Sequence, residues 1–195
     1  MRALLLLVLF VFGSTAFADK YNVDMQHTNV AFTVPHLVVS KVKGRFDKFE
    51  GSFDFDEKSQ KLDNVVVTIE ANSINTNEKD RDKHLRSPDF FDVAKYKTLQ
   101  FKSTKTIYEA AKPKKLEGTL TIRGVTKPVT LDIEYKGAVT DPWGNRHIAF
   151  EASTKINRQD YNLKWNKALE AGGFVVGDDV KIDIDGEAMV ANAKK

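Results

Sequence analysis

The feature that most constrains the fold is a strict alternation of apolar and polar residues that recurs along the chain. In its clearest form, Val180, Ile182 and Ile184 alternate with charged residues. A period of two residues is typical of β-strands with one buried face. Eight segments show this pattern, at residues 30–36, 49–55, 65–69, 99–103, 116–124, 129–135, 148–156 and 180–190, with a possible ninth at Tyr21–Met25. The sequence therefore predicts an all-β protein.

Short turns join most of these segments, including Asp56-Glu57-Lys58, Gly124–Lys127 and Asp141–Gly144. Such turns favour antiparallel neighbours, because parallel strands need crossovers of a dozen residues or more. A meander with one apolar face can form either a sandwich or a barrel. Closure into a barrel removes exposed edges, so we expect an extended eight-stranded antiparallel barrel. Its interior has room for packed side chains or one small ligand.

Two irregular regions interrupt the alternation. Residues 73–97 predict a short helical insertion around residues 77–95, capped by Asn75, Thr76 or Asn77 and ended at Ser87-Pro88. Residues 162–177 carry a tryptophan, a phenylalanine and several glycines. Both regions are candidates for the mouth of a barrel, because ligand contacts concentrate on loops that a rigid scaffold holds.

The first 18 residues have the layout of a secretory signal peptide. Arg2 precedes the apolar run Ala3–Phe12, and Ala16-Phe17-Ala18 forms a small-residue cleavage site. The apolar run is too short to span a bilayer, and later runs fall short of about 20 residues. We expect cleavage after Ala18, a single barrel domain over residues 19–195 and no membrane span after removal of the signal.

Composition and motifs weaken several function classes. The chain has no cysteine, which excludes disulfides, thiol nucleophiles and cysteine-ligated zinc, and its net charge of +3 gives no argument for nucleic acid. The four histidines lack metal-ligand spacing, and neither a GxSxG elbow nor a Gly-rich nucleotide loop occurs. The sequence thus predicts a binding protein, not an enzyme, with no metal and no required cofactor.

One polar cluster, Arg81, Asp82 and His84, lies in the predicted helical insertion. It fits a solvated helix face held by local ion pairs. It also fits a polar gate for a ligand head group, since arginine binds phosphate or carboxylate in a bidentate manner. Both interpretations remain open at this point.

Apolar residues on the predicted strands and in the second irregular region suggest an elongated pore. Burying one CH₂ contributes about 0.8 kcal/mol, so one isoprene unit contributes roughly 3–4 kcal/mol. Alternation shows which residues share a face, but not which face looks inward. The residues that we expect to line the pore are Phe32, Val34, Phe46, Phe53, Phe101, Leu120, Leu131, Phe150, Trp165 and Phe174.

Motifs spread along the chain resemble those of one family, the YceI family of lipocalin-like proteins. They occur in order and cover nearly all of the chain after the signal. The matching stretches are His27–Leu37, Gly44–Phe46, Phe49–Gly51, Ser73–Asn77, Arg81–Leu85, Ser87–Asp92, Gly118–Val129 and Asp141–Gly144. Two stretches depart from the family pattern: Lys97 replaces a frequent proline, and Tyr161-Asn162-Leu163 replaces a frequent Asp-Phe-Gly-like stretch.

The resemblance implies a lipocalin-like barrel with a long hydrophobic pore, found in the periplasm and commonly as a homodimer. It implies a long-chain amphiphile as ligand: a polyisoprenoid, a quinone tail, or a fatty amide or acid. Transport, storage or sensing of that lipid is the leading hypothesis. One alternative is an enzyme or redox partner that acts on a lipid-borne head group near His84 and Arg81. Another is a barrel plugged by phenylalanines that serves in interactions or stress response.

Overall fold

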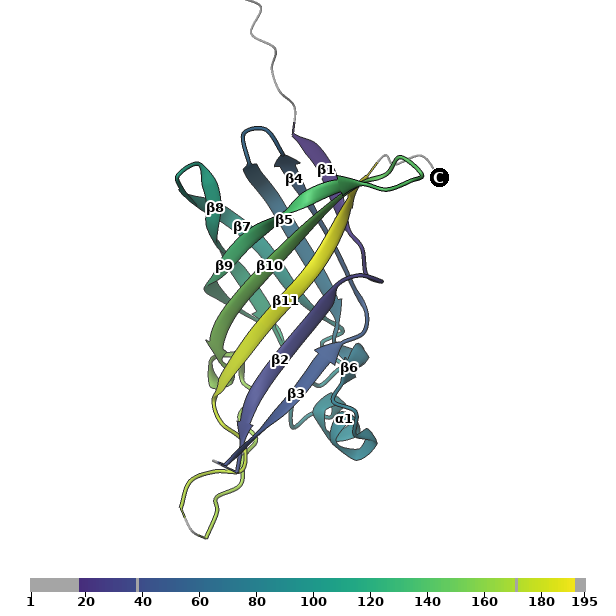
Figure 1. The fold of residues 1–195 in the computed structure, drawn as a ribbon. Coiled ribbons are helices and arrows are strands. Elements are labelled where there is room, and N and C mark those ends of the chain that lie inside the picture. The colour runs from purple at the N-terminus through teal and green to yellow at the C-terminus, as the bar shows by residue number, and fades with distance from the viewer. Residues whose placement is uncertain (1–17, 38, 171, 192–195) are drawn as a thin grey trace, which may run out of the picture.

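The computed structural model describes residues 18–37, 39–170 and 172–191, and it shows a closed antiparallel barrel with one short α-helix (Figure 1). Eight strands form the wall in the order β1-β4-β5-β7-β8-β9-β10-β11, and pairing of β1 with β11 closes it. The strands are β1 (Asp19–Val23), β2 (Asn29–His36), β3 (Ser40–Phe46), β4 (Phe49–Asp56), β5 (Lys61–Glu70), β6 (Ile74–Asn75), β7 (Thr98–Glu109), β8 (Lys112–Ile122), β9 (Val125–Thr140), β10 (Arg146–Asn157) and β11 (Asp179–Val190). The predicted eight-stranded antiparallel barrel is confirmed.

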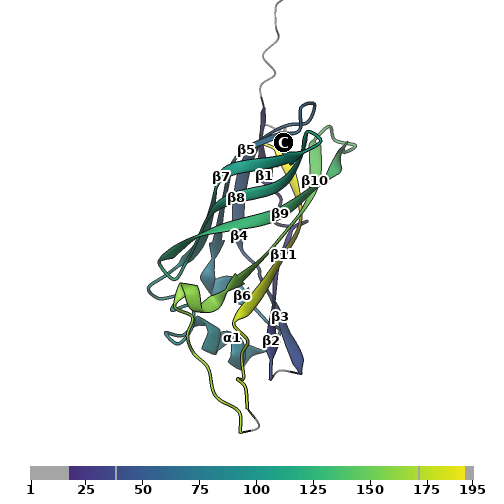
Figure 2. The same ribbon diagram turned by 90° about the vertical axis from the view of Figure 1, so that its left-hand side faces the viewer.

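Two positions in the wall are each occupied by two strands that lie end to end: β1 and β2 in one, and β3 and β4 in the other. The first half of β11 pairs with β2, and its last residues pair with β1. On the other side β1 pairs with β4, while β2 pairs with β3. The chain therefore interrupts one long strand at residues 24–28, and β2, β3 and β6 extend the wall beyond the closed part (Figures 1 and 2).

The strand β3 was not among the eight predicted segments. Its inward positions include Gly44 in place of a large apolar residue, and Lys41, Lys43 and Arg45 occupy the alternate positions. The glycine has a packing reason: a Cβ there would lie 2.4 Å from the ring of Phe32. A strand whose inward face carries a glycine under a neighbour's ring gives only a weak apolar pattern.

The apolar faces of the strands point into the barrel. On β11, Val180, Ile182 and Ile184 face inward, and the intervening charged residues face outward. The predicted runs on β8 and β10 do the same, so that Leu116, Leu120 and Ile156 belong to the buried core. Alternation alone left the inward face open, and burial in the closed barrel settles it.

The helical insertion consists of helix α1 (Lys79–Arg86), followed by turns that lead to β7. The expected caps Asn75, Thr76 and Asn77 are wrong. Glu78 caps the helix, since its carboxylate accepts hydrogen bonds from the backbone N–H of Asp80 and Arg81. Asn77 has a left-handed backbone with φ 59°, which turns the chain just before the helix starts. The predicted end at Ser87 is confirmed.

The predicted signal peptide, residues 1–18, lies outside the described residues except for Ala18. Among the residues that the structure does describe, no helix has the length and apolar character needed to cross a membrane.

Candidate functional site

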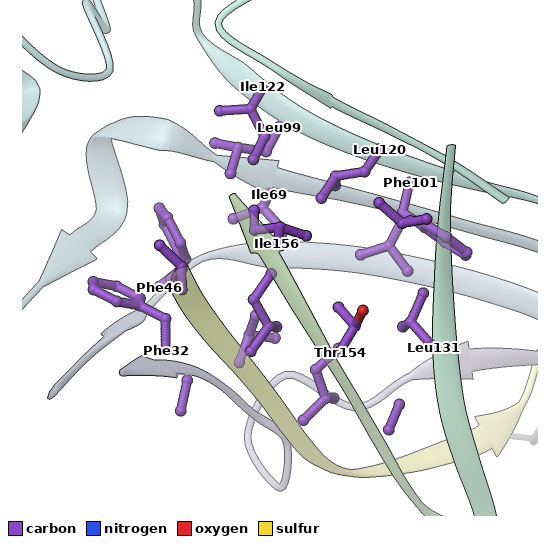
Figure 3. A pocket seen from close by; sticks show the side chains of 18 of the residues that line it. Phe32, Phe46, Ile69, Leu99, Phe101, Leu120, Ile122, Leu131, Thr154 and Ile156 are labelled. Carbon is purple, nitrogen blue, oxygen red and sulfur yellow. The ribbon is translucent and has the colours of Figure 1, made fainter. Parts of the chain in front are cut away.

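The barrel encloses a cavity of about 580 Å³. This volume lies within the range of about 300–1,000 Å³ typical of ligand-binding pockets. Side chains from opposite walls face one another across it, among them Phe32, Leu99, Leu120, Leu131 and Ile156 (Figure 3). The lining is mainly aliphatic and aromatic, so water gains few hydrogen bonds there and an apolar ligand is favoured.

The polar groups of the central wall are satisfied by the wall itself. Thr154 points toward the cavity (Figure 3), and its hydroxyl donates a 2.8 Å hydrogen bond to the carbonyl oxygen of Thr130. The ring of Phe101 packs closely on Gly118, where a Cβ would come within 2.6 Å of the ring. The centre of the cavity is therefore a smooth apolar surface that offers shape, not polar recognition.

Aromatic rings fill the barrel at the end where β1 and the β4–β5 turn lie. Tyr21 is fully buried and stacks on Phe53 with ring centroids 5.7 Å apart. Phe55 lies 5.1 Å from Tyr135, and Phe53 meets Phe150 edge-on at 6.0 Å. We call these five residues the aromatic plug. They close this end of the cavity.

An ion pair fixes the plug to the barrel wall. The Tyr21 hydroxyl donates a 2.8 Å hydrogen bond to Glu57, and Arg146 Nε donates another of 2.8 Å to the same carboxylate. The hydrogen bond from Arg146 lowers the pKa of Glu57 below its usual 4.5, despite the opposing effect of burial. Burial, followed by the hydrogen bond to Glu57, raises the pKa of the Tyr21 hydroxyl. Glu57 is therefore a carboxylate at neutral pH.

At the opposite end, α1 and the loop at residues 162–178 surround the mouth of the cavity (Figure 1). The helix is docked through Thr76. The backbone N–H and the hydroxyl of Thr76 donate hydrogen bonds to buried Asp82 at 2.8 and 2.6 Å. Arg81 donates to the hydroxyl and carbonyl oxygens of Thr76 at 2.7 and 2.8 Å. Exposed Glu78 and Asp80 also line the cavity, which gives the mouth a polar rim.

An aromatic group stands beside this rim. The ring of His84 meets Trp165 edge-on at 4.8 Å and Phe90 edge-on at 5.1 Å. His84 Nε2 lies 3.0 Å from a carboxylate oxygen of Asp89. Across the mouth, Phe91 meets Phe46 edge-on at 5.9 Å. The mouth therefore combines polar groups and aromatic faces.

The loop at residues 162–178 is held in place by a buried arginine. Arg158 is 3% exposed, and it donates to the carbonyl oxygens of Leu163, Trp165 and Gly177 and to the Asp178 carboxylate. Burial lowers the pKa of its guanidinium, against the attraction of Asp178. One side chain thus sets the position of Trp165 at the mouth.

Nine of the ten expected pore residues line the cavity: Phe32, Val34, Phe46, Phe53, Phe101, Leu120, Leu131, Phe150 and Trp165. Phe174 lies outside the lining and is 58% exposed on the mouth loop. Its segment forms an isolated bridge with Ala168 of the same loop, so Phe174 stays on the loop and does not enter the barrel. Arg81 and His84 line the mouth, whereas Asp82 is buried against Thr76 and positions the helix.

Sequence reasoning missed Arg158 and did not assign Phe90 and Phe91 to the site. Both phenylalanines line the mouth, and their adjacency in an otherwise polar segment was a signal for such a role. Arg158 gave no signal, because an arginine beside Gln159 and Asp160 has the composition of a solvated turn. Its burial depends on a loop that returns from distant residues.

A closed eight-stranded barrel around an apolar cavity, with a polar rim at its mouth, has the form of a small-molecule binding pocket enclosed by a β-barrel. The chain belongs to the YceI-like family, whose domain model matches residues 21–188.

Known proteins of similar sequence or fold include the following three. A UPF0312 protein of Enterobacter sp. (strain 638) is 46% identical over 157 residues, which cover 80% of this chain and 81% of that protein. The crystal structure of the Campylobacter jejuni YceI protein is 33% identical, with a TM-score of 0.66 over 80% of this chain and 88% of that one. A polyisoprenoid-binding domain from Saccharophagus degradans, 18% identical, shares the fold with a TM-score of 0.62 over 87% and 98% of the two chains.

Proposed function

We propose that this protein binds a long-chain amphiphile inside the barrel, with the chain in the apolar cavity and the head group at the polar mouth. The observation that carries the proposal is the cavity itself, about 580 Å³ lined by side chains such as Leu120 and Leu131. An interior plugged throughout by phenylalanines would leave no such space. The aromatic plug occupies only one end.

A polyisoprenoid, quinone tail or fatty chain fits this cavity better than a compact ligand. Each buried CH₂ contributes about 0.8 kcal/mol, so affinity grows along a chain, while ordering costs keep the total below the sum. The Saccharophagus degradans domain of the same fold is described as polyisoprenoid-binding. That description supports the ligand class for this chain, and the head group stays undefined.

The length of the ligand's hydrocarbon chain gives the test. Purified protein is titrated with isoprenoid alcohols that differ by single isoprene units, and binding is followed by the fluorescence of Trp165 at the mouth. Trp143 on the β9–β10 turn is replaced by phenylalanine to remove its signal; it is 83% exposed. We expect affinity to rise with each added unit and to level off when the cavity is full. Affinity independent of chain length would contradict enclosure.

We further propose a binding role and not catalysis. His84 contacts Asp89 and two aromatic rings, and Arg81 is bonded to Thr76, which are contacts that build the mouth. A His84→Ala variant should keep its bound lipid. If the protein instead converts a lipid-borne head group and this variant loses that turnover, the enzyme or redox alternative is correct.

Periplasmic location and a homodimer remain predictions from the signal sequence and the family resemblance. In the periplasm, such a protein would transport, store or sense its lipid. Fractionation of cells that produce the full chain tests the location. Light scattering on the purified protein tests the dimer.

A further inference from the structure

A second cluster of chemically active side chains lies on the outer wall of the barrel, away from the cavity lining. Asp24 and His27 belong to the interruption between β1 and β2, and Glu187 comes from β11. One ligand atom from each of the three residues lies within 4.8 Å of the other two. Glu187 faces outward, because it alternates with buried Gly186 and Ala188.

Backbone hydrogen bonds hold the three residues together. The Asp24 N–H donates to the Glu187 carbonyl oxygen at 2.9 Å. The Thr28 hydroxyl donates to that same oxygen at 3.2 Å and accepts from the Glu187 N–H at 3.1 Å. The interruption of the long strand therefore has a defined shape that presents Asp24 and His27 to Glu187.

Within this shape the donor atoms are already close. His27 Nδ1 lies 2.7 Å from Asp24 Oδ2, and the other oxygen of Asp24 accepts from the Gln26 N–H at 2.9 Å. A second imidazole stands behind Glu187, since His147 Nδ1 lies 3.8 Å from its Oε2. The fold thus brings together histidines that are far apart in the sequence, which is why their spacing predicted no such cluster.

One imidazole nitrogen with two carboxylates is a ligand set of first-row transition metals, whereas Mg²⁺ and Ca²⁺ prefer oxygen ligands alone. Three protein ligands leave a fourth tetrahedral position for water. His27 is 60% exposed, so an ion can reach the cluster from solvent. An ion between the ligands would replace the direct contact of His27 with Asp24.

From this geometry we propose that Asp24, His27 and Glu187 form a binding site for a divalent transition-metal ion on the outer wall, separate from the lipid cavity. The site does not depend on the proposed lipid function. Zn²⁺ is the probe, because it takes both nitrogen and carboxylate ligands without redox chemistry.

Calorimetric titration of the untagged protein with Zn²⁺, in a buffer that does not chelate metals, tests the site. We expect about one ion per chain. His27→Gln and Glu187→Gln should each weaken binding by at least about tenfold, the lower bound measured for lost partners around metal sites. Asp183→Asn is the matched control, because Asp183 lies on the outer face of the same strand and pairs with Lys181. It should bind Zn²⁺ like the wild type.

Imidazole NMR on the wild-type protein keeps the test decisive even if a variant does not fold. Added Zn²⁺ should shift the ring ¹⁵N resonances of His27 and leave those of His36 and His84 in place. No binding of Zn²⁺ to the wild type would overturn the proposal. So would shifts confined to His36 or His84, or unchanged affinity in both folded ligand variants.

Discussion

The two ends of the barrel are built from different interactions, although both contain aromatic rings. At the plugged end, rings such as Phe55 pack against one another inside the barrel, and one ion pair, Glu57 with Arg146, fixes them. At the mouth, the rings stand on α1, on the turns that follow it and on the loop at residues 162–178, and arginine side chains hold the backbone. Arg123, for example, donates to the carbonyl oxygens of Asn162 and Pro88 at 2.6 and 2.7 Å, which joins the loop to the segment after α1.

This difference separates stability from access. The plugged end excludes water by dense packing, which is sensitive to the loss of single methylene groups. The mouth depends on hydrogen bonds from forked guanidinium groups to carbonyl oxygens, which fix a loop without filling the space that it surrounds. A barrel can thus obtain stability from the packing at one end and keep access to its cavity at the other.

The largest effect should come from removing a ring of the plug. Phe55→Ala should lower the free energy of unfolding by about 3–5 kcal/mol, because the space left by a buried phenylalanine collapses only in part. Urea denaturation measures this change. Phe174→Ala, on the exposed part of the mouth loop, is the control and should stay within about 0.5 kcal/mol of the wild type. Equal losses in both variants would remove the distinction between the ends.

A smaller loss should follow from Arg158→Ala. Buried hydrogen bonds to a charged group contribute about 1.5–3 kcal/mol, so we expect destabilisation of about 3 kcal/mol. Hydrogen exchange should become faster across residues 162–178 by more than in the plug around Phe55. Arg158→Lys should not rescue protection, because an ammonium group cannot reproduce the fork. Full protection in Arg158→Lys would show that charge alone holds the loop.

Blocking the cavity between the two ends should affect binding more than folding. Leu131→Trp places a large ring in the central wall and should weaken the longest isoprenoid that fits by at least about tenfold, or about 1.4 kcal/mol. Shorter chains should lose less. Val66→Trp is the control, since Val66 is 43% exposed and lies outside the cavity lining. Similar losses in the two variants would place the ligand elsewhere.

The smallest effect concerns pH at the plugged end. The pKa of Glu57 is below 4.5 in the folded protein, so its ion pair stabilises the fold above about pH 4.5. That contribution is lost as the pH falls through the folded-state pKa. We expect Glu57→Gln to be less stable than the wild type near pH 7 and to approach it as the pH falls below 4.5 and through the folded-state pKa. A constant difference in urea midpoint across this range would contradict the assigned pair.

The barrel could be predicted from the sequence because inward and outward residues alternate in almost every strand. Leu116, Leu120 and Ile122 show this on β8, where all three are buried. The same pattern placed seven of the ten expected residues in the cavity wall, without itself showing which face points inward, while Phe46 and Trp165 line the cavity from outside the predicted strands. The strand β3 was missed because its inward Gly44 makes room for Phe32 and so carries no apolar signal.

The contacts that fix the mouth loop and the outer-wall cluster could not be predicted in this way, because they join distant segments. Arg158 is buried only when the loop returns through Gly177 and Asp178. Glu187 meets Asp24 and His27 only once the barrel closes. The alternation of apolar and polar residues along a strand predicts that strand well. It does not show which polar residues of different strands lie together once the sheet closes.

Mass spectrometry of an organic extract tests the central claim most directly. The protein is produced as the full chain, purified without detergent, and extracted beside its Leu131→Trp variant. The account predicts one class of long-chain amphiphile at close to one molecule per wild-type chain, and much less from the variant. Recovery of buffer components alone from the wild type, or equal amounts of lipid from both proteins, would contradict a ligand enclosed in the barrel.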